Sequence, residues 1–393
     1  MLDKLARLLP WRSDGARERK AVGSTYFAFD GLAKPAWSPK DYVSFAREGM
    51  MRNAIVYRSI RMISEAAASV PLIAYDGHQQ LDGHPMLDLM AGSSSGKTAF
   101  DLFEIIYGHL LVAGNAYIDA VAVASEIAGL HVLRPDRVRL ITGSDGWPEA
   151  FEYTAGQSKT VIRGDATLNV PRILHMKLFH PASDHYGLSP LEASAAAIDV
   201  HNTAGRWNKA LLDNSARPSG ALVYTADGHL TGEQFSRLKS ELDENFQGAR
   251  NAGRPLLLEG GLDWKVMSLT PRDMDFIEAK NAAAREIALA LGVPPMLLGI
   301  PGDNTYANYQ EANRTFWRQT VLPLVQRTVR SLSRWLSPAW ERDVMLKPDL
   351  NAIQALAPER EALWLRLEQS SFLSLNEKRA AVGYGPVDGG DVV

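Results

Sequence analysis

Apolar positions along the chain follow two different spacings, and the change between them predicts a mixed α+β fold. In the first part, apolar residues recur every three or four positions, as on one face of a helix; Ile55, Ile60 and Ile63 are examples. Pro71 ends this pattern, and Thr98 precedes a later helical run as its cap. The spacing predicts three helices, over residues 41–69, 84–90 and 99–113. A short hairpin is predicted between the first helix and the second.

Short β-type segments replace the helical spacing between residues 115 and 180. Gly, Pro and Asp separate them, as is typical of turns between strands. The pattern predicts a small sheet with antiparallel parts, so that residues 41–185 form one α+β domain. The predicted strands are residues 116–124, 129–133, 138–142, 151–154, 160–162 and 173–178.

Helical spacing returns in the second half, where three long helices are predicted over residues 189–215, 271–291 and 311–336. The second is rich in alanine, which permits close packing, and Pro323 is expected to kink the third. A mixed segment of strands and one helix, 216–270, separates the first two. A run of Pro and Gly followed by the polar letters DNTYANYQ separates the second from the third and predicts a loop. The tail predicts a strand at VMLKP and helices over about 358–372 and 375–382.

Composition limits the function classes. The chain has 393 residues, 46% hydrophobic and 22% charged, so most of it is expected to fold, into two or three domains. Its 42 basic and 45 acidic residues give a formal charge of −3, whereas a free-standing DNA-binding domain is usually basic. The lack of cysteine excludes disulfides, thiolate catalysis and cysteine-based metal sites. No apolar run approaches the roughly 18 residues of a membrane span, and the first residues do not predict a signal peptide.

The letters AGSSSGKT at 91–98 match a loose phosphate-binding loop, in which Lys97 and Thr98 face phosphate and magnesium. That chemistry needs a buried strand before the loop, and the preceding residues predict a helix. A Ser/Gly loop with Thr98 as a helix cap is therefore favoured, and a nucleotide hydrolase remains one alternative. The same loop also matches G-x-S-x-G, the pattern of a nucleophilic serine, which needs a histidine and an aspartate as catalytic partners. His109 and Asp119 follow in the sequence, but such a pair arises by chance in any chain of this length, so no catalytic triad is predicted.

Other polar groups favour structural roles. His175, His180 and His185 recur every fifth residue, which differs from the spacing of a helical metal pair and predicts no metal site. Acidic residues at the start of the second long helix match the helix dipole better than acid–base catalysis; they are Asp273, Asp275 and Glu278. Arginines on the kinked helix lie beside aromatic residues and favour packing against protein; they are Arg314, Arg318, Arg327, Arg330 and Arg334. No catalytic residue and no cofactor is predicted.

Ordered motifs over about residues 41–390 resemble the portal proteins of long-tailed bacteriophages, also found in prophages and gene transfer agents. The motifs are NAIVYRSIRMISEAAASVP at 53–71, GNAY at 114–117, YGLSPL at 186–191, RPSG at 217–220, LEGG at 258–261, DMDFIEAK at 273–280, EIALALGVPPMLLG at 286–299, TYANYQEA at 305–312, LNEKR at 375–379 and GPV at 385–387. Each motif is weak alone, and the ordered set is specific.

The resemblance implies a portal fold that assembles as a ring around a central channel. Its parts are expected to be a flexible N-terminal arm (1–40), a wing (41–187), a first stem helix (188–215), a clip (216–270), a second stem helix (271–294), a tunnel loop (295–311), a kinked long helix (312–341), and the end of the wing with a small C-terminal crown (342–393).

The resemblance also implies a function. The protein is expected to form a dodecameric channel at one vertex of a phage or gene transfer agent head, and to be assembled in the bacterial cytoplasm. The expected partners are the major capsid protein, the large subunit of the terminase, a head–tail adaptor and double-stranded DNA of any sequence, with no membrane. A non-viral ring scaffold of the same fold is the second alternative.

The predicted site residues lie in two loops. Short polar groups of the tunnel loop are expected to contact DNA in the channel; they are Asp303, Asn304, Thr305, Tyr306 and Asn308. In the clip, Arg250 and Arg254 flank a glycine-rich turn and are expected to face the terminase or the adaptor.

Overall fold

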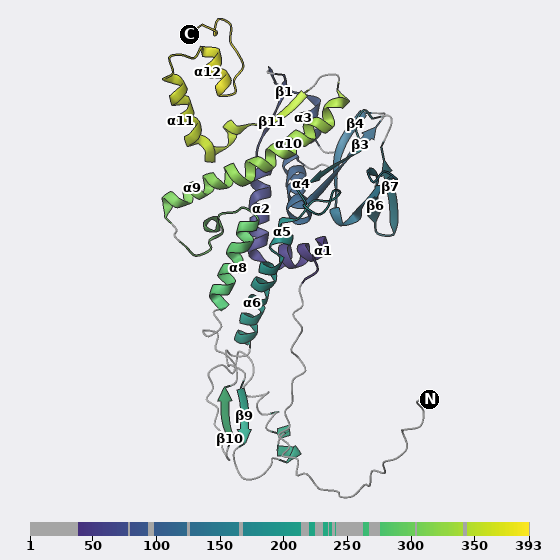
Figure 1. The fold of residues 1–393 in the computed structure, drawn as a ribbon, viewed down its shortest axis with the longest axis vertical. Coiled ribbons are helices and arrows are strands. Elements are labelled where there is room, and N and C mark those ends of the chain that lie inside the picture. Colours follow the sequence, from purple (N-terminus) through teal and green to yellow (C-terminus); the bar gives the residue numbers. More distant parts are fainter. Residues whose placement is uncertain are drawn as a thin grey trace, which may run out of the picture. The chain divides into compact units, whose positions relative to one another are not determined.

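The computed structural model describes most of the chain (Figure 1). The described residues are 38–77, 79–92, 98–123, 126–164, 168–213, 220–224, 231–234, 236–237, 240, 262–266, 276–302, 305–340 and 344–392. Within these ranges no helix is long and apolar enough to cross a membrane.

The first predicted helix is interrupted, so its prediction as one continuous helix is wrong. A short helix α1 (Tyr42–Ser44) runs into a π-helical segment η1 (Phe45–Met51), and α2 (Ala54–Ala68) begins after a break. Asn53 is extended at the break, with φ −115° and ψ 111°, and its side-chain oxygen accepts the N–H groups of Ile55 and Val56. An asparagine that caps a helix in this way competes with continuation of the preceding one.

Two further helices and nine strands complete the predicted wing and its sheets. The helices are α3 (Pro85–Ala91) and α4 (Ala99–Ala113). The strands are β1 (Leu72–Asp76), β2 (Gln79–Leu81), β3 (Asn115–Val123), β4 (Glu126–Leu133), β5 (Val138–Thr142), β6 (Pro148–Ala155), β7 (Ser158–Arg163), β8 (Ile173–Lys177) and β11 (Val344–Pro348), with a 3-10 turn η2 (Pro135–Arg137) before β5.

These strands form three antiparallel sheets, in the orders β11–β1–β2, β4–β3–β8 and β5–β6–β7. The predicted antiparallel pairing is confirmed. The first sheet joins distant parts of the sequence, because Ala74 on β1 lies opposite Leu346 on β11.

The core gathers around α2, α4 and the long helix α10 (Leu322–Leu336), which lie close together in Figure 1. The side chains of Ile60, Ile106 and Leu332 are at most 1% exposed. Full burial of one such side chain contributes about 1.5–3 kcal/mol, so this core fixes the frame that carries the stem helices and loops.

The two predicted stem helices pack against each other (Figure 1). The first is divided into α5 (Pro190–Ala193) and α6 (Ala195–Asp213), and the second is α8 (Phe276–Ala290). Ala204 of α6 and Ala283, Ala284 and Ala288 of α8 are buried, so the predicted close packing of the alanine-rich helix is confirmed. Beyond these helices, β9 (Gly220–Tyr224) and β10 (Leu262–Val266) pair antiparallel.

The kinked helix begins earlier than predicted, because α9 spans Tyr306–Phe316. Thr305 caps it, so the polar letters that predicted a loop up to residue 311 are helical from residue 306. The predicted interruption of this helix near Pro323 is present as a π-helical turn, η5 (Trp317–Val321), directly before α10. Proline has no N–H to donate, and a π turn is one way for a helix to absorb that loss.

The C-terminal part follows the predicted order of elements. After 3-10 turns η6 (Ser337–Ala339), η7 (Leu350–Ala352) and η8 (Gln354–Leu356) come α11 (Ala357–Glu368) and α12 (Leu375–Ala381). The side chain of Asn376 holds the last residues against α12, since its amide donates to the carbonyl of Val387 at 3.0 Å and to the carboxylate of Asp391 at 2.7 Å.

Candidate functional site

The predicted channel residues lie at the junction between α8 and α9. Asp303 and Asn304 are outside the described residues. Thr305 is the N-cap of α9, and its hydroxyl accepts the N–H of Asn308 at 3.2 Å. Tyr306 is the first residue of α9, and Asn308 is exposed in the first turn. The structure therefore divides the predicted tunnel loop into a short connection and the exposed start of a helix.

The segment from Pro295 to Pro301, which we call the root, folds back against α8 and precedes this loop. The turn η4 (Pro295–Leu298) reverses the chain, and Ile300 then packs against Ala284 and Ala288 with only 5% of its surface exposed. Arg285 of α8 donates a hydrogen bond from its guanidinium to the carbonyl of Pro301. The segment before the loop thus runs back along the helix that it has just left.

A second contact ties the end of α8 to the π turn. Gly292 ends the helix with φ +69°, and its carbonyl accepts the hydroxyl of Thr320 at 2.5 Å. A Cβ at Gly292 would lie 2.8 Å from that hydroxyl oxygen, so the approach requires glycine. The end of α8 is therefore fastened to the π turn that follows α9.

Ion pairs connect α9 and the π turn to α11. Arg314 lies 3.1 Å from Glu311 and 3.8 Å from Glu359, and Arg318 lies 3.4 Å from Glu359. Surface pairs of this kind contribute about 0–1 kcal/mol each, so they orient the helices more than they stabilise them. The predicted packing role of this helix is supported by its aromatic residues, because Phe316 and Trp335 are buried.

The predicted clip residues Arg250 and Arg254 lie outside the described residues. Their place in the sequence is between β9 and β10, and the strand ends that flank this segment are paired, with Tyr224 opposite Leu262. Their contacts stay a prediction.

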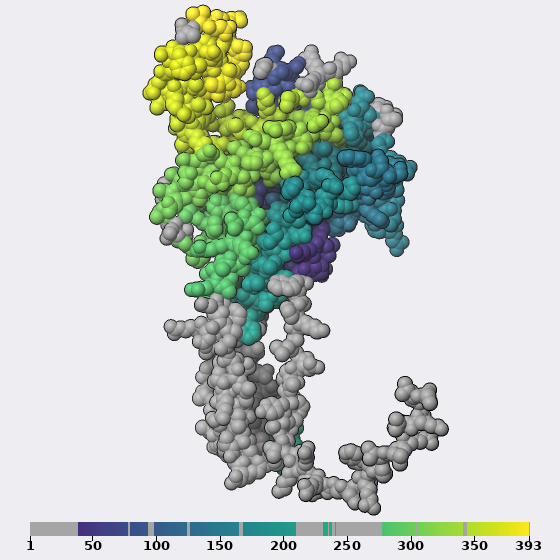
Figure 2. Space-filling model, in the orientation of Figure 1, coloured from purple at the N-terminus to yellow at the C-terminus, as the bar shows by residue number. Residues whose placement is uncertain are grey.

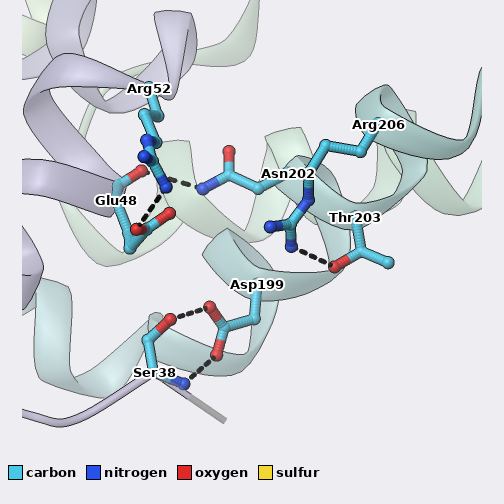
Figure 3. A network of polar contacts seen from close by, with 7 residues as sticks. All are labelled: Ser38, Glu48, Arg52, Asp199, Asn202, Thr203 and Arg206. Carbon is cyan, nitrogen blue, oxygen red and sulfur yellow. Dashed lines mark hydrogen bonds and ion pairs between the residues drawn. The ribbon is translucent and has the colours of Figure 1, made fainter. Parts of the chain in front are cut away.

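A polar network attaches α6 to the N-terminal segment (Figure 3). Ser38 donates to both carboxylate oxygens of Asp199, from its N–H at 3.0 Å and from its hydroxyl at 2.7 Å. One turn further, Asn202 donates to the carbonyl of Glu48 at 2.8 Å, and the carboxylate of Glu48 pairs with Arg52 at 2.7 Å. Sequence patterns did not predict this network, because its members are ordinary polar residues far apart in the chain.

Asn115 joins the sheet to the start of the stem. Its amide donates to the carbonyl of Ala113 at 2.8 Å, and its oxygen accepts the N–H of Gly187 at 2.7 Å. The GNAY and YGLSPL motifs therefore meet at one junction. Ser189 completes it, since its hydroxyl caps α5 and donates to the carbonyl of Val112 at 2.8 Å.

Two histidines near this junction are neutral through burial. Burial lowers the pKa of His109 to about 4, and it also lowers that of His175 to about 4, with a smaller effect of the positive charge of Lys177. The ring of His175 stacks on Tyr117 with 4.3 Å between centroids, and its Nε2 lies 3.0 Å from the oxygen of Asn115. No group of three metal-binding side chains occurs in the part of the chain that the structure describes.

The residues around the AGSSSGKT loop have structural partners. His84 caps α3, so a helix precedes the loop as predicted. Thr98 caps α4 in a capping box with Asp101, whose carboxylate accepts the Thr98 hydroxyl at 2.7 Å. Lys97 lies outside the described residues. Asp119 pairs with Arg172 at 2.9 Å, which does not match a catalytic triad with His109.

Comparisons of the sequence and of the structure with known proteins agree on the family that this chain resembles. The family model described as "Phage portal protein" matches residues 54–383. The chain is 51% identical to a chain in the neck of an empty gene transfer agent particle, with a TM-score of 0.71, and the match covers 92% of this chain and 98% of that one. A chain in the neck of a native particle, computed with C12 symmetry, is 50% identical with a TM-score of 0.68, covering 91% and 97%. The probable portal protein of Streptomyces phage phiC31 is 26% identical over 92% of this chain and 84% of its own length.

Proposed function

We propose that this chain, which belongs to the phage portal protein family, forms a ring through which double-stranded DNA enters and leaves the head of a phage-like particle. The observation that carries the proposal is the 51% identity to a chain from a gene transfer agent neck, over nearly the whole length of both chains. We place the ring at the portal vertex of such a particle, after assembly in the bacterial cytoplasm.

Twelve subunits are proposed, because the related native neck was computed with C12 symmetry. A ring of identical subunits needs two different complementary surfaces on each copy. The paired stem helices lie side by side at the surface in Figure 2, and they expose apolar side chains at Val200, Ile277 and Leu289. Exposed apolar groups on packed helices favour a contact with the next subunit.

The proposed channel guides DNA without reading its sequence. Duplex DNA carries one negative charge per about 1.7 Å, so a strongly basic lining would hold it rather than let it pass. The formal charge of −3 per chain corresponds to about −36 for twelve copies, which suits a conduit. We propose that the short polar side chains of Thr305, Asn308 and their neighbours in the loop make transient contacts with DNA phosphates, independent of the DNA sequence.

The partners follow from the same function. The residues between β9 and β10, with Arg250 and Arg254, are proposed to meet the terminase during packaging and the head–tail adaptor afterwards. Residues 41–187 and 342–393 are proposed as the wing and crown, next to the capsid protein and the head interior. We propose no catalytic group in this chain; ATP hydrolysis belongs to the terminase. Magnesium-dependent ATP turnover that is lost in Lys97→Ala would overturn that part.

The loop assignment is tested by replacing Asp303 and Asn304 with glycine in particle-producing cells. This change preserves the chain length and the Thr305 cap. We expect rings of normal mass and a several-fold loss of packaged or retained DNA, measured as nuclease-protected DNA per particle. Gln157→Gly, in the exposed turn between β6 and β7, is the matched control. Normal DNA content in the loop variant would show that these residues do not act on DNA.

A further inference from the structure

We propose that Arg285 is a positioning residue for the channel loop, which it ties to stem helix α8. The proposal rests on the function proposed above for that loop. It adds a residue outside the loop that the sequence motifs did not single out.

The contact lies at the last fixed point before the loop. The Arg285 guanidinium donates to the carbonyl of Pro301, and a Cβ placed on Gly302 would lie 3.4 Å from the same guanidinium. Only Gly302, Asp303 and Asn304 stand between Pro301 and Thr305, which begins the cap of α9. Arg285 therefore sets where the loop starts.

Two kinds of contact hold this root, and they differ in what they stabilise. Ile300 is buried against Ala284 and Ala288, so it contributes to the packing of the subunit. Arg285 projects from the exposed side of α8, and an exposed hydrogen bond adds little to global stability. Loss of the Arg285 contact should loosen the loop while the subunit remains folded.

The short connection makes the position of the root important. Four residue steps separate Pro301 from Thr305, a maximum reach of about 14 Å at roughly 3.5 Å per residue. Because Ile300 and Pro301 contact α8, the connection to α9 starts beside that helix. Movement of α8 would then be transmitted to the loop through the Arg285–Pro301 contact.

The test compares Arg285→Ala with Arg285→Lys, and uses Glu286→Ala on the same exposed side of α8 as the matched control. Lysine keeps the charge and can donate one hydrogen bond to a carbonyl, so it should restore part of the effect. Three quantities are measured in full-length protein: ring mass, hydrogen exchange of peptides covering residues 299–308, and nuclease-protected DNA per particle.

We expect Arg285→Ala to form rings of normal mass, to exchange the 299–308 amides about tenfold faster, and to lower DNA per particle several-fold. Arg285→Lys should be intermediate and Glu286→Ala normal. Unchanged exchange in Arg285→Ala overturns the proposal, and so does failure to form rings, because Arg285 would then be an assembly residue. If exchange rises and DNA content stays normal while the Asp303/Asn304 glycine variant loses DNA, the loop function stands and the positioning role is wrong. If both variants keep normal DNA content, the loop function itself is wrong.

Discussion

At the scale of single residues, burial controls the chemistry of two histidines. His109 and His175 are partly buried in the predicted wing, and desolvation favours the neutral form of each ring. The neutral His175 is compatible with donation from Nε2 to the oxygen of Asn115, which itself holds Gly187. Protonation of either ring would place a positive charge in a desolvated site, which costs free energy in the folded chain.

This environment predicts acid sensitivity. Both pKa values are about 4 in the folded chain and about 6.5 when the rings are exposed, so the unfolded chain binds more protons between pH 6.5 and 4. Stability should then fall as the pH is lowered through this window, by at most about 1.4 kcal/mol per pH unit for each histidine. Denaturant unfolding from pH 8 to 4 measures it. His175→Gln should flatten the slope; an unchanged slope would show that His175 does not supply it.

The role of Thr98 was predictable from the sequence because a helix cap depends on local geometry. Its hydroxyl accepts the N–H of Asp101 in the helix that follows. The cap at Asn53 was not predicted, since it lies within a continuous helical pattern. Its burial comes from contacts with His201 and Asn202, more than 140 positions away in the sequence.

At the scale of elements, the tight connection between α4 and β3 depends on glycine. Gly114 has φ +71°, and a Cβ there would lie 2.5 Å from the backbone carbon of Leu188. Both the left-handed backbone and the close approach of another segment exclude a side chain. The junction of GNAY with YGLSPL is therefore a backbone-to-backbone contact.

Substitution of two glycines separates these causes. Gly114→Ala should lower the free energy of unfolding by about 3 kcal/mol or more, the sum of backbone strain and overpacking. Gly77 has a similar φ of +59° with no atom within 4 Å of its would-be Cβ, so Gly77→Ala should cost only about 1 kcal/mol. Guanidinium unfolding of both variants measures the difference. Equal losses would mean that strain alone sets the cost at Gly114.

The existence of most elements was predictable, and their interruptions were not. Periodicity predicted the helices and the antiparallel strands because each buries one face. It missed the break at Ser194 and the early start of α9 at Tyr306, since polar residues at a cap resemble those on an exposed helix face. The candidate loop was predicted too long for this reason.

At the scale of the whole molecule, pairing between distant segments is beyond local patterns. The antiparallel pair of β1 and β11 joins residues about 270 positions apart, and only the folded chain brings them together. The ordered motifs identified the family correctly, because they sample the same fold at many points. The contacts of the helices on either side of the proposed channel loop were not predictable, since Arg285, Thr320 and Glu359 come from three separate elements.

A ring of this protein that conducts DNA should be visible by electron microscopy of particles that contain it, reconstructed without imposed symmetry. We expect a ring of about twelve copies at one head vertex, with a bore wider than the roughly 20 Å of a DNA duplex and the loop between α8 and α9 lining it. Particles with no ring of this chain at any vertex, or a ring whose bore is too narrow for a duplex, would contradict it.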